Sequence, residues 1–231
     1  MWLRRLAMTA LFALLLCGCA DVLDARAESA LRDALARVLG PAASYEVSIS
    51  GASLDGRRFE RVRVVGHRIA RPDTPVLDRF ALDLHGVVVD REHRTLAAVA
   101  DSRAELLLRA DDLAAFLRRW LADPVVVFSA PDRIGIVGAP RLGGVAVLGG
   151  DGAEFEGRLG GAGSQLHLRI DRLRIGHASA PPLVRALLET ALDPIFDLAA
   201  YPLPAQIDAV AVADGTLRIA ASGSRLSARA P

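Results

Sequence analysis

Three segments of this chain alternate apolar and polar side chains one by one, and this pattern limits the fold more than any other feature. The segments are residues 59–66, 78–86 and 164–176. Their apolar positions are Val62 and Val64, then Phe80, Leu82 and Leu84, and finally Leu166, Leu168 and Ile170. Successive side chains of a strand point to opposite faces, so each segment predicts a β-strand with one apolar face. Such half-buried strands are typical of antiparallel sheets.

Turn signals separate the expected strands. Asp214-Gly215 is a two-residue hairpin signal between the runs that contain Val212 and Leu217. After Ile170 the apolar phase shifts by one residue, which predicts a β-bulge near Asp171. The glycine-rich stretch 141–164 has the composition of a phosphate-binding loop, but no Gly-Lys-Ser/Thr follows it. We therefore expect hairpin turns there.

Three amphipathic helices interrupt or precede the strands. The first covers residues 20–39 and ends at Gly40-Pro41. The second covers 112–122, with Asp111 or Asp112 as N-cap and Pro124 as the stop. The third begins at Pro181-Pro182 and extends to Phe196, with a kink or restart at Pro194. Its apolar residues form two adjoining stripes, wider than contact with one sheet requires, so something must cover the second stripe.

These elements predict one α+β domain, a long curved antiparallel sheet wrapped around one or two amphipathic helices. The apolar helix faces exceed the sheet contact, so they form either an ordinary core or the wall of a cleft that an acyl chain can fill. The residues expected to form either this core or the wall of a lipid-binding groove are Phe116, Trp120, Leu187, Leu192 and Phe196. Arg61, Arg63 and Arg169 fall on the opposite faces of their strands, so we expect solvated charges there rather than a phosphate clamp.

The first 19 residues have the layout of an export signal. Arg4 and Arg5 precede an apolar run from Leu6 to Leu16, which is too short to span a bilayer. Leu16-Cys17-Gly18-Cys19 resembles the bacterial lipobox, which implies cleavage of residues 1–18 and attachment of acyl chains such as palmitate to Cys19. A Cys-x-Cys metal pair and a disulfide are the alternatives, but the chain has no other cysteine to complete a site.

Such a lipoprotein would lie in the cell envelope, facing the periplasm or the outside, as a single domain of residues 19–231. Its membrane contact would include the N-terminal lipid anchor. Ala20, rather than Asp, follows the cysteine, which favours the outer membrane if the host has two membranes.

Composition and spacing exclude several other functions. All 28 basic residues are arginine, so pyridoxal Schiff bases and phosphate-loop lysines are absent. The formal charge of +1 falls by two, to about −1, once Arg4 and Arg5 leave, and no basic tract suggests a nucleic-acid partner. The histidines lack metal-ligand spacing, and Ser53 does not lie in a Gly-x-Ser-x-Gly elbow. We therefore expect no catalytic residues, no metal and no cofactor.

The order of elements carries a family resemblance. It includes the "VRVVG" strand, "RADDLAAFL", the "LHLRIDRLRIG" strand and the closing "YPLPAQIDAVAVADGTLRIAASG". These patterns resemble the LmeA-like phospholipid-binding family of bacterial envelope proteins and extend over nearly the whole mature chain. The resemblance implies phospholipid or another envelope lipid as the ligand, in a module of the tubular, BPI-like lipid-binding type. A non-catalytic scaffold lipoprotein that holds an unknown protein partner is the alternative function.

Overall fold

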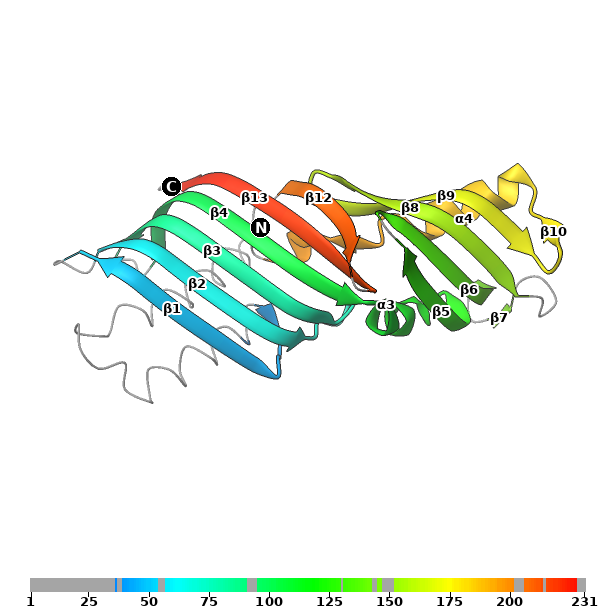
Figure 1. Ribbon diagram of the computed structural model, residues 1–231, viewed down its shortest axis with the longest axis horizontal. Coiled ribbons are helices and arrows are strands. Elements are labelled where there is room, and N and C mark those ends of the chain that lie inside the picture. Colours follow the sequence, from blue (N-terminus) through cyan, green and yellow to red (C-terminus); the bar gives the residue numbers. More distant parts are fainter. Residues whose placement is uncertain are drawn as a thin grey trace.

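The computed structural model describes residues 36, 39–53, 57–90, 95–129, 131–142, 145–146, 152–201, 206–213 and 215–227. These residues form two curved, open antiparallel sheets and two α-helices, in an elongated molecule with one sheet toward each end (Figure 1). The predicted α+β class with mostly antiparallel strands is confirmed. The strands nevertheless divide between two sheets, whereas the alternation had suggested one long sheet.

Sheet A has six strands in the order β1-β2-β3-β4-β13-β12. Their bounds are β1 Ser44–Ala52, β2 Arg58–Ile69, β3 Leu77–Asp90, β4 Thr95–Arg109, β13 Thr216–Ser227 and β12 Gln206–Ala213. The hairpin between β12 and β13 pairs Ala213 with Thr216, which confirms the predicted two-residue turn at 214–215.

Sheet B follows the order β10-β9-β8-β6-β5, and two short strands pair with it outside this path. Its bounds are β5 Leu121–Ser129, β6 Arg133–Leu142, β8 Ala153–Ala162, β9 Gln165–Ile175 and β10 Ala178–Ser179, with β7 Val145–Ala146 on β6 and β11 Phe196–Asp197 on β9. The antiparallel pairs Leu142–Val145 and Ala162–Gln165 confirm two of the hairpin turns expected in the glycine-rich stretch, while residues 147–151 lie outside the described part.

The predicted alternation decides which face of each strand is buried. We call the face that carries the buried side chains the inner face of each sheet. Val62 pairs with Leu84 and Val64 pairs with Leu82 on the inner face of sheet A, where all four are buried. Arg61 and Arg63 are exposed on the outer face, as the sequence predicts.

The predicted bulge at Asp171 is present. Gly157 of β8 pairs with Ile170, whereas the preceding Glu156 pairs with Arg172, so Asp171 is the extra residue on β9. This insertion returns Leu173 to the inner face, where it is 4% exposed.

Strand β12 joins the two sheets. It pairs with β13 in sheet A, and two of its amides donate hydrogen bonds to carbonyls at the edge of sheet B. Ile207 N donates to Gly163 O over 2.7 Å, and Val212 N donates to Pro131 O over the same distance. The buried Tyr201 ring continues the junction inside, because it lies 5.9 Å from both Phe80 of β3 and Phe196 of β11. One apolar core therefore runs through both sheets.

The second predicted helix is shorter than expected. Helix α3 covers Ala110–Leu117, and its N-cap is Arg109, without a side-chain cap. Asp112 is in the first turn, where its carboxylate accepts two hydrogen bonds from the Arg68 guanidinium instead of capping the helix. Leu121 already belongs to β5 because its backbone pairs with β6. Pro124 lies beside an irregularity in this edge strand, where a missing N–H costs no ladder bond.

The third helix also ends early. Helix α4 covers Pro182–Leu192, with proline in its first turn as predicted. Pro194 neither kinks nor restarts the helix. Instead the chain turns to extended backbone at Asp193, forms β11 and continues into the short 3₁₀ helix η1, Leu198–Ala200. Phe196 is therefore a strand residue, because its backbone pairs with Leu166 of β9.

Most of the first predicted helix lies outside the described residues. Ala36 and Leu39 are helical, and Gly40 N donates to Ala36 O over 3.0 Å with Gly40 at φ +108°. The expected stop at Gly40 is therefore confirmed. In the part of the chain that the structure describes, no helix is long and apolar enough to cross a membrane.

Candidate functional site

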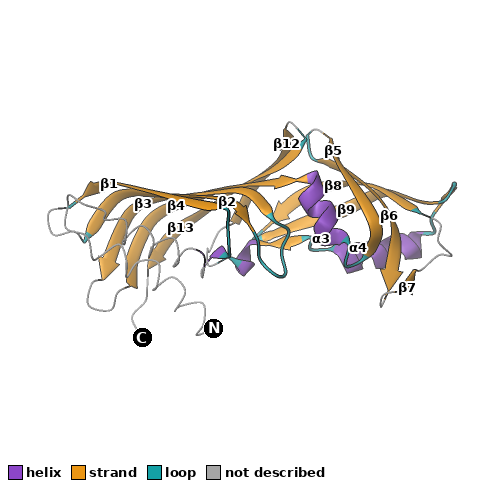
Figure 2. Cartoon of the chain, turned by 90° about the horizontal axis from the view of Figure 1, so that it is seen from below, coloured by secondary structure: helices purple, strands orange, loops and turns teal. Residues whose placement is uncertain are grey.

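The inner face of β2, β3 and β4 carries a continuous apolar surface. We call it the sheet A inner surface and define it by Phe59, Val62, Leu84, Val87 and Val99, each at most 8% exposed. Helix α3 packs against β4 and β5, and helix α4 packs against β9. Neither helix lies over the β1–β3 half of sheet A (Figures 1 and 2).

One shared irregularity shapes this surface. Two residues, rather than one, separate the inward side chains Phe59 and Val62 on β2, Leu84 and Val87 on β3, and Val99 and Ser102 on β4. The register places the three breaks side by side, since Arg61 pairs with His85 and His85 with Asp101. Gly86 permits the break in β3 because its φ is +59°. Aligned breaks of this kind bend a sheet, and Figure 2 shows its curvature.

The side chains that define the sheet A inner surface are all apolar, so none of them needs a hydrogen-bond partner. Ser102 is the buried polar residue nearest in register, and its hydroxyl donates to Gly223 O over 2.9 Å. Within the described residues, every buried side-chain nitrogen or oxygen has a hydrogen-bond partner. A ligand on this surface therefore gains from contact with CH₂ groups rather than from hydrogen bonds.

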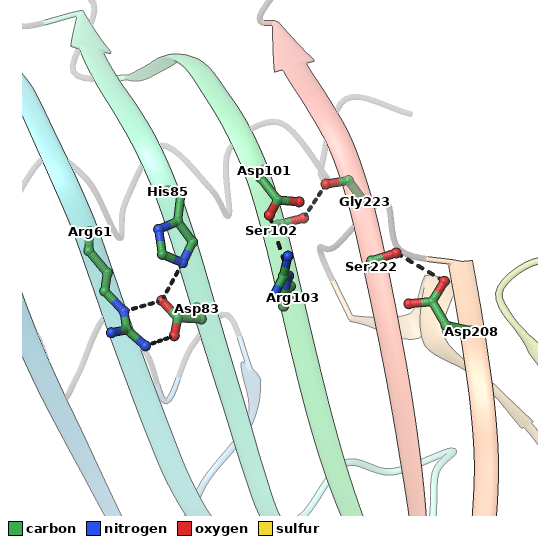
Figure 3. Close-up of polar contacts among 9 residues, drawn as sticks. All are labelled: Arg61, Asp83, His85, Asp101, Ser102, Arg103, Asp208, Ser222 and Gly223. Carbon is green, nitrogen blue, oxygen red and sulfur yellow. Dashed lines mark hydrogen bonds and ion pairs between the residues drawn. The ribbon is translucent and has the colours of Figure 1, made fainter.

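The outer face of sheet A is charged, and Figure 3 shows how its groups pair. Arg61 donates two hydrogen bonds to the Asp83 carboxylate, and His85 Nε2 lies 3.3 Å from Asp83 Oδ1. The hydrogen bonds from Arg61 hold the pKa of Asp83 below its ordinary value. Beside this group lies a hollow of about 570 Å³, with Arg63, Asp101, Arg103 and Asp208 among its lining residues.

Several of the charges around that hollow have partners at nearby positions. Arg103 Nε lies 3.5 Å from Asp101 Oδ2, and Ser222 Oγ donates to Asp208 Oδ1 over 3.0 Å (Figure 3). Such exposed, mutually paired charges are typical of a solvated sheet face. The predicted solvated positions of Arg61 and Arg63 agree with this arrangement, and Arg169 is likewise exposed on β9.

Among the described residues, no group of three or more His, Cys, Asp or Glu side chains could hold a metal ion. His167 Nδ1 lies 2.9 Å from Asp193 Oδ2, which makes it a hydrogen-bond partner of the residue that ends α4. His93 lies outside the described part of the chain, as do Cys17 and Cys19.

The structure does not bring the five predicted groove residues together. Phe116 and Trp120 form one pair at the α3 end, with ring centroids 5.3 Å apart and the Arg119 guanidinium over both rings. Both are partly buried against the core. Leu192 and Phe196 are buried, at 4% and 3% exposure, on the β9 side. Strands β5 and β9 lie toward opposite edges of sheet B, so these residues belong to two separate places.

Leu187 belongs to neither place, since its side chain is 62% exposed on α4. Sequence reasoning also passed over the sheet A inner surface as a site, although the alternation had identified Val62 and Leu84 as inward residues. The pattern alone could not tell which strands a helix would cover, because that depends on contacts between distant parts of the chain.

Comparison with known proteins adds one finding. The model of the family described as LmeA-like phospholipid-binding matches residues 19–222. No curated protein and no solved structure matches the chain. The match covers most of the chain, including both sheets, the two described helices and the sheet A inner surface. This chain belongs to the LmeA-like phospholipid-binding family.

Proposed function

We propose that the protein binds the acyl chains of a phospholipid, or of a similar envelope lipid, on the sheet A inner surface. The observation that carries the proposal is the combination of phospholipid-binding family membership with an apolar, curved surface over which neither described helix lies. An acyl chain is a run of CH₂ groups, and each one buried contributes about 0.8 kcal/mol. Several contacts with Phe59, Leu84 and Val87 are therefore enough to retain a lipid.

Sheet B is the weaker candidate for the same role. Its inner face includes Phe155, which is 2% exposed and pairs through its backbone with Ile136 of β6 and Leu173 of β9. Helices α3 and α4 pack at the two sides of this sheet. Phe155 therefore serves as the matched core position against which the sheet A inner surface is tested.

Single tryptophan reporters test the proposal. Trp2 and Trp120 are replaced by Phe in the full chain, and the only tryptophan is then introduced as Phe59→Trp or as Phe155→Trp. Phospholipids brominated along the acyl chain are added, and tryptophan emission is recorded. We expect strong quenching at position 59 and little at position 155. Lipid extraction and mass spectrometry of the same protein verify that lipid is bound.

Two results would contradict the proposal. Bound lipid with quenching at 155 but not at 59 would move the site to sheet B. A protein that neither retains nor exchanges lipid would support the scaffold function instead. The pair Phe116 and Trp120 stays a candidate for part of the groove, and the unmodified Trp120 reports on it in the same way.

The envelope role includes the N-terminal anchor. We propose that residues 1–18 are a signal peptide and that Cys19 carries the acyl chains of a lipoprotein whose single domain follows it. The lipobox resemblance of Leu16-Cys17-Gly18-Cys19 supports this. Fatty-acid analogues should label the wild type and leave Cys19→Ala unlabelled. Labelling that persists in Cys19→Ala would contradict the proposed anchor at Cys19. Fractionation of a host with two membranes would test the outer-membrane placement that Ala20 favours.

A further inference from the structure

Helix α4 has two apolar stripes, of which one packs against the core and the other is exposed. Val184, Leu188 and Leu192 pack against the core. Leu183 and Leu187, one turn apart, are 71% and 62% exposed. Helix α4, which carries these two leucines, runs beside β9 and β10 toward one end of the elongated molecule (Figure 1). The second stripe, for which the sequence indicates no contact, is therefore exposed on α4.

The anchoring of α4 explains why this stripe cannot turn inward. The carboxylate of Glu189 accepts a hydrogen bond from Ile170 N over 2.7 Å. The carboxylate of Asp193 accepts one from Leu168 N over 2.9 Å. These two acids bind free amides at the edge of β9, between the segments paired with β11 and β10. They fix the rotation of α4 about its axis.

The same contacts remove negative charge from the exposed side. Residues 176–188 contain only two ionisable side chains, His177 and Arg185, and both are exposed. Arg185 makes no ion pair with any described residue. Thr190 is the polar residue next to the exposed leucines, and its hydroxyl donates to Ala186 O over 2.9 Å within the helix. The exposed face formed by residues 183–187 is therefore apolar, with no acidic side chain and with one positive charge that makes no ion pair in the described part of the chain.

We propose that this face of α4, defined by Leu183, Arg185 and Leu187, docks onto the surface of a lipid bilayer that contains anionic phospholipid. Leucine side chains enter the boundary between headgroups and acyl chains, while an arginine beside them stays at the level of the phosphates. The inference rests on the proposed function, because a protein that exchanges phospholipid must contact the membrane that supplies it.

Size and charge favour a bilayer over a second protein. A stable protein interface buries about 800 Å² on each partner, and two leucines with one arginine on a narrow helix cover much less. A bilayer imposes no such minimum, because each inserted side chain gains separately from burial. The matched contrast is on β5, where Val125 and Val127 are 58% and 57% exposed but have Asp123 nearby in sequence.

The decisive experiment places a fluorophore on each patch. The full chain carries Cys17→Ala and Cys19→Ala, so that Leu187→Cys or Val127→Cys provides the only thiol for an environment-sensitive NBD label. Vesicles of phosphatidylcholine and phosphatidylglycerol are added, with or without lipids that bear a quencher on the acyl chain. We expect a blue shift and quenching for the label at 187 and no change at 127. An unchanged label at 187 would overturn the proposal.

Substitutions then measure the contribution of the face. The variant Leu183→Gln, Leu187→Gln should slow lipid exchange with vesicles by about tenfold or more, since two leucines lose their insertion. The control Val125→Gln, Val127→Gln should leave the rate unchanged. Arg185→Gln should weaken binding to anionic vesicles by about fivefold and remove its salt dependence. Equal effects of the two double variants would contradict a specific docking face.

Two further outcomes distinguish a failure of membrane docking from a failure of lipid binding. If lipid co-purifies with the protein but the label at 187 never enters the bilayer, docking fails while lipid binding stands. If no lipid is retained or exchanged, the proposed function itself fails. Sedimentation analysis covers the remaining case, because self-association lost in Leu183→Gln, Leu187→Gln without any vesicle response would identify a protein interface and overturn the bilayer proposal.

Discussion

Sheets A and B share the same alternation of apolar and polar residues, but their surroundings differ. In sheet B, the outer edge of β9 is occupied along its length by β11, Asp193, Glu189 and β10. Helix α3 packs on β5 at the other side. In sheet A, neither described helix lies over β1–β3 (Figure 2). Similar strands thus lie beside α3 and α4 in one sheet and away from them in part of the other, although the inner faces of both sheets are buried.

The carboxylates of the two sheets also differ in their hydrogen-bond partners. Carboxylates beside sheet B accept hydrogen bonds from backbone amides and are partly buried. Carboxylates on the outer face of sheet A pair with exposed arginines and histidine (Figure 3). Removing the first kind leaves a backbone donor without a partner, whereas removing the second kind leaves side chains that water solvates.

The largest expected effect separates the two inner faces. Phe155→Ala should lower the free energy of unfolding by about 3–5 kcal/mol, because it leaves a cavity in a covered core. Urea unfolding with and without phospholipid should give the same loss. Phe59→Ala should instead lose more stability with lipid than without it, since the truncation weakens lipid binding as well. Lipid-independent losses for both variants would contradict the proposed difference between the sheets.

The next effect concerns the edge of β9. Asp193→Ala should cost about 1–3 kcal/mol, because Leu168 N and His167 lose their acceptor. Asp193→Asn keeps an oxygen acceptor and should cost less. Asp208→Ala is the matched control on sheet A, where, among the described residues, Ser222 donates a hydrogen bond to the carboxylate. Hydrogen exchange at the Leu168 amide should accelerate in Asp193→Ala alone, and an unchanged rate there would refute the edge role.

A smaller effect is expected from Tyr45, which lies at the start of β1 in sheet A. The Tyr45 hydroxyl donates to Gly40 O over 2.6 Å, and burial raises the pKa of the phenol above its ordinary value. A raised pKa stabilises the protonated form, so this contribution is present below the ordinary tyrosine pKa of about 10 and is lost as the pH rises above it. Tyr45→Phe should cost about 1 kcal/mol near neutral pH. Its alkaline loss of stability should also be weaker than that of the wild type.

The smallest effect should come from the charges on the outer face of sheet A. Asp83 has a lowered pKa because Arg61 binds its carboxylate, so the stability from this pair is present above the ordinary aspartate pKa and disappears as the pH falls through the lowered one. Arg61→Gln should move the Asp83 pKa toward its ordinary value in an NMR titration, with little change in unfolding. A large loss of stability or of anionic-lipid binding would show that this face is part of a site.

Short-range patterns predicted much of the local structure. The inward positions Val62, Leu84 and Leu168, the bulge at Asp171 and the turn at 214–215 depend only on residues close together in sequence. The ends of the helices were predicted less well. The sequence allows Asp112 as a cap, but Arg68, 44 positions away, binds it in the folded chain. The sequence pattern places Phe196 in a helix, but β9 supplies a strand partner for it.

The strand faces, the apolar stripes of the helices and the candidate lipoprotein signal follow from the amino-acid sequence, because backbone period and neighbouring residues are enough to define them. Long-range contacts in the folded chain divide the strands between two sheets, pack α3 and α4 beside sheet B, and leave Leu187 exposed while Leu192 is buried. The physical reason is that an apolar stripe can be buried against any apolar surface of matching shape. Which surface it meets depends on long-range contacts, such as those of Glu189 and Asp193 with β9.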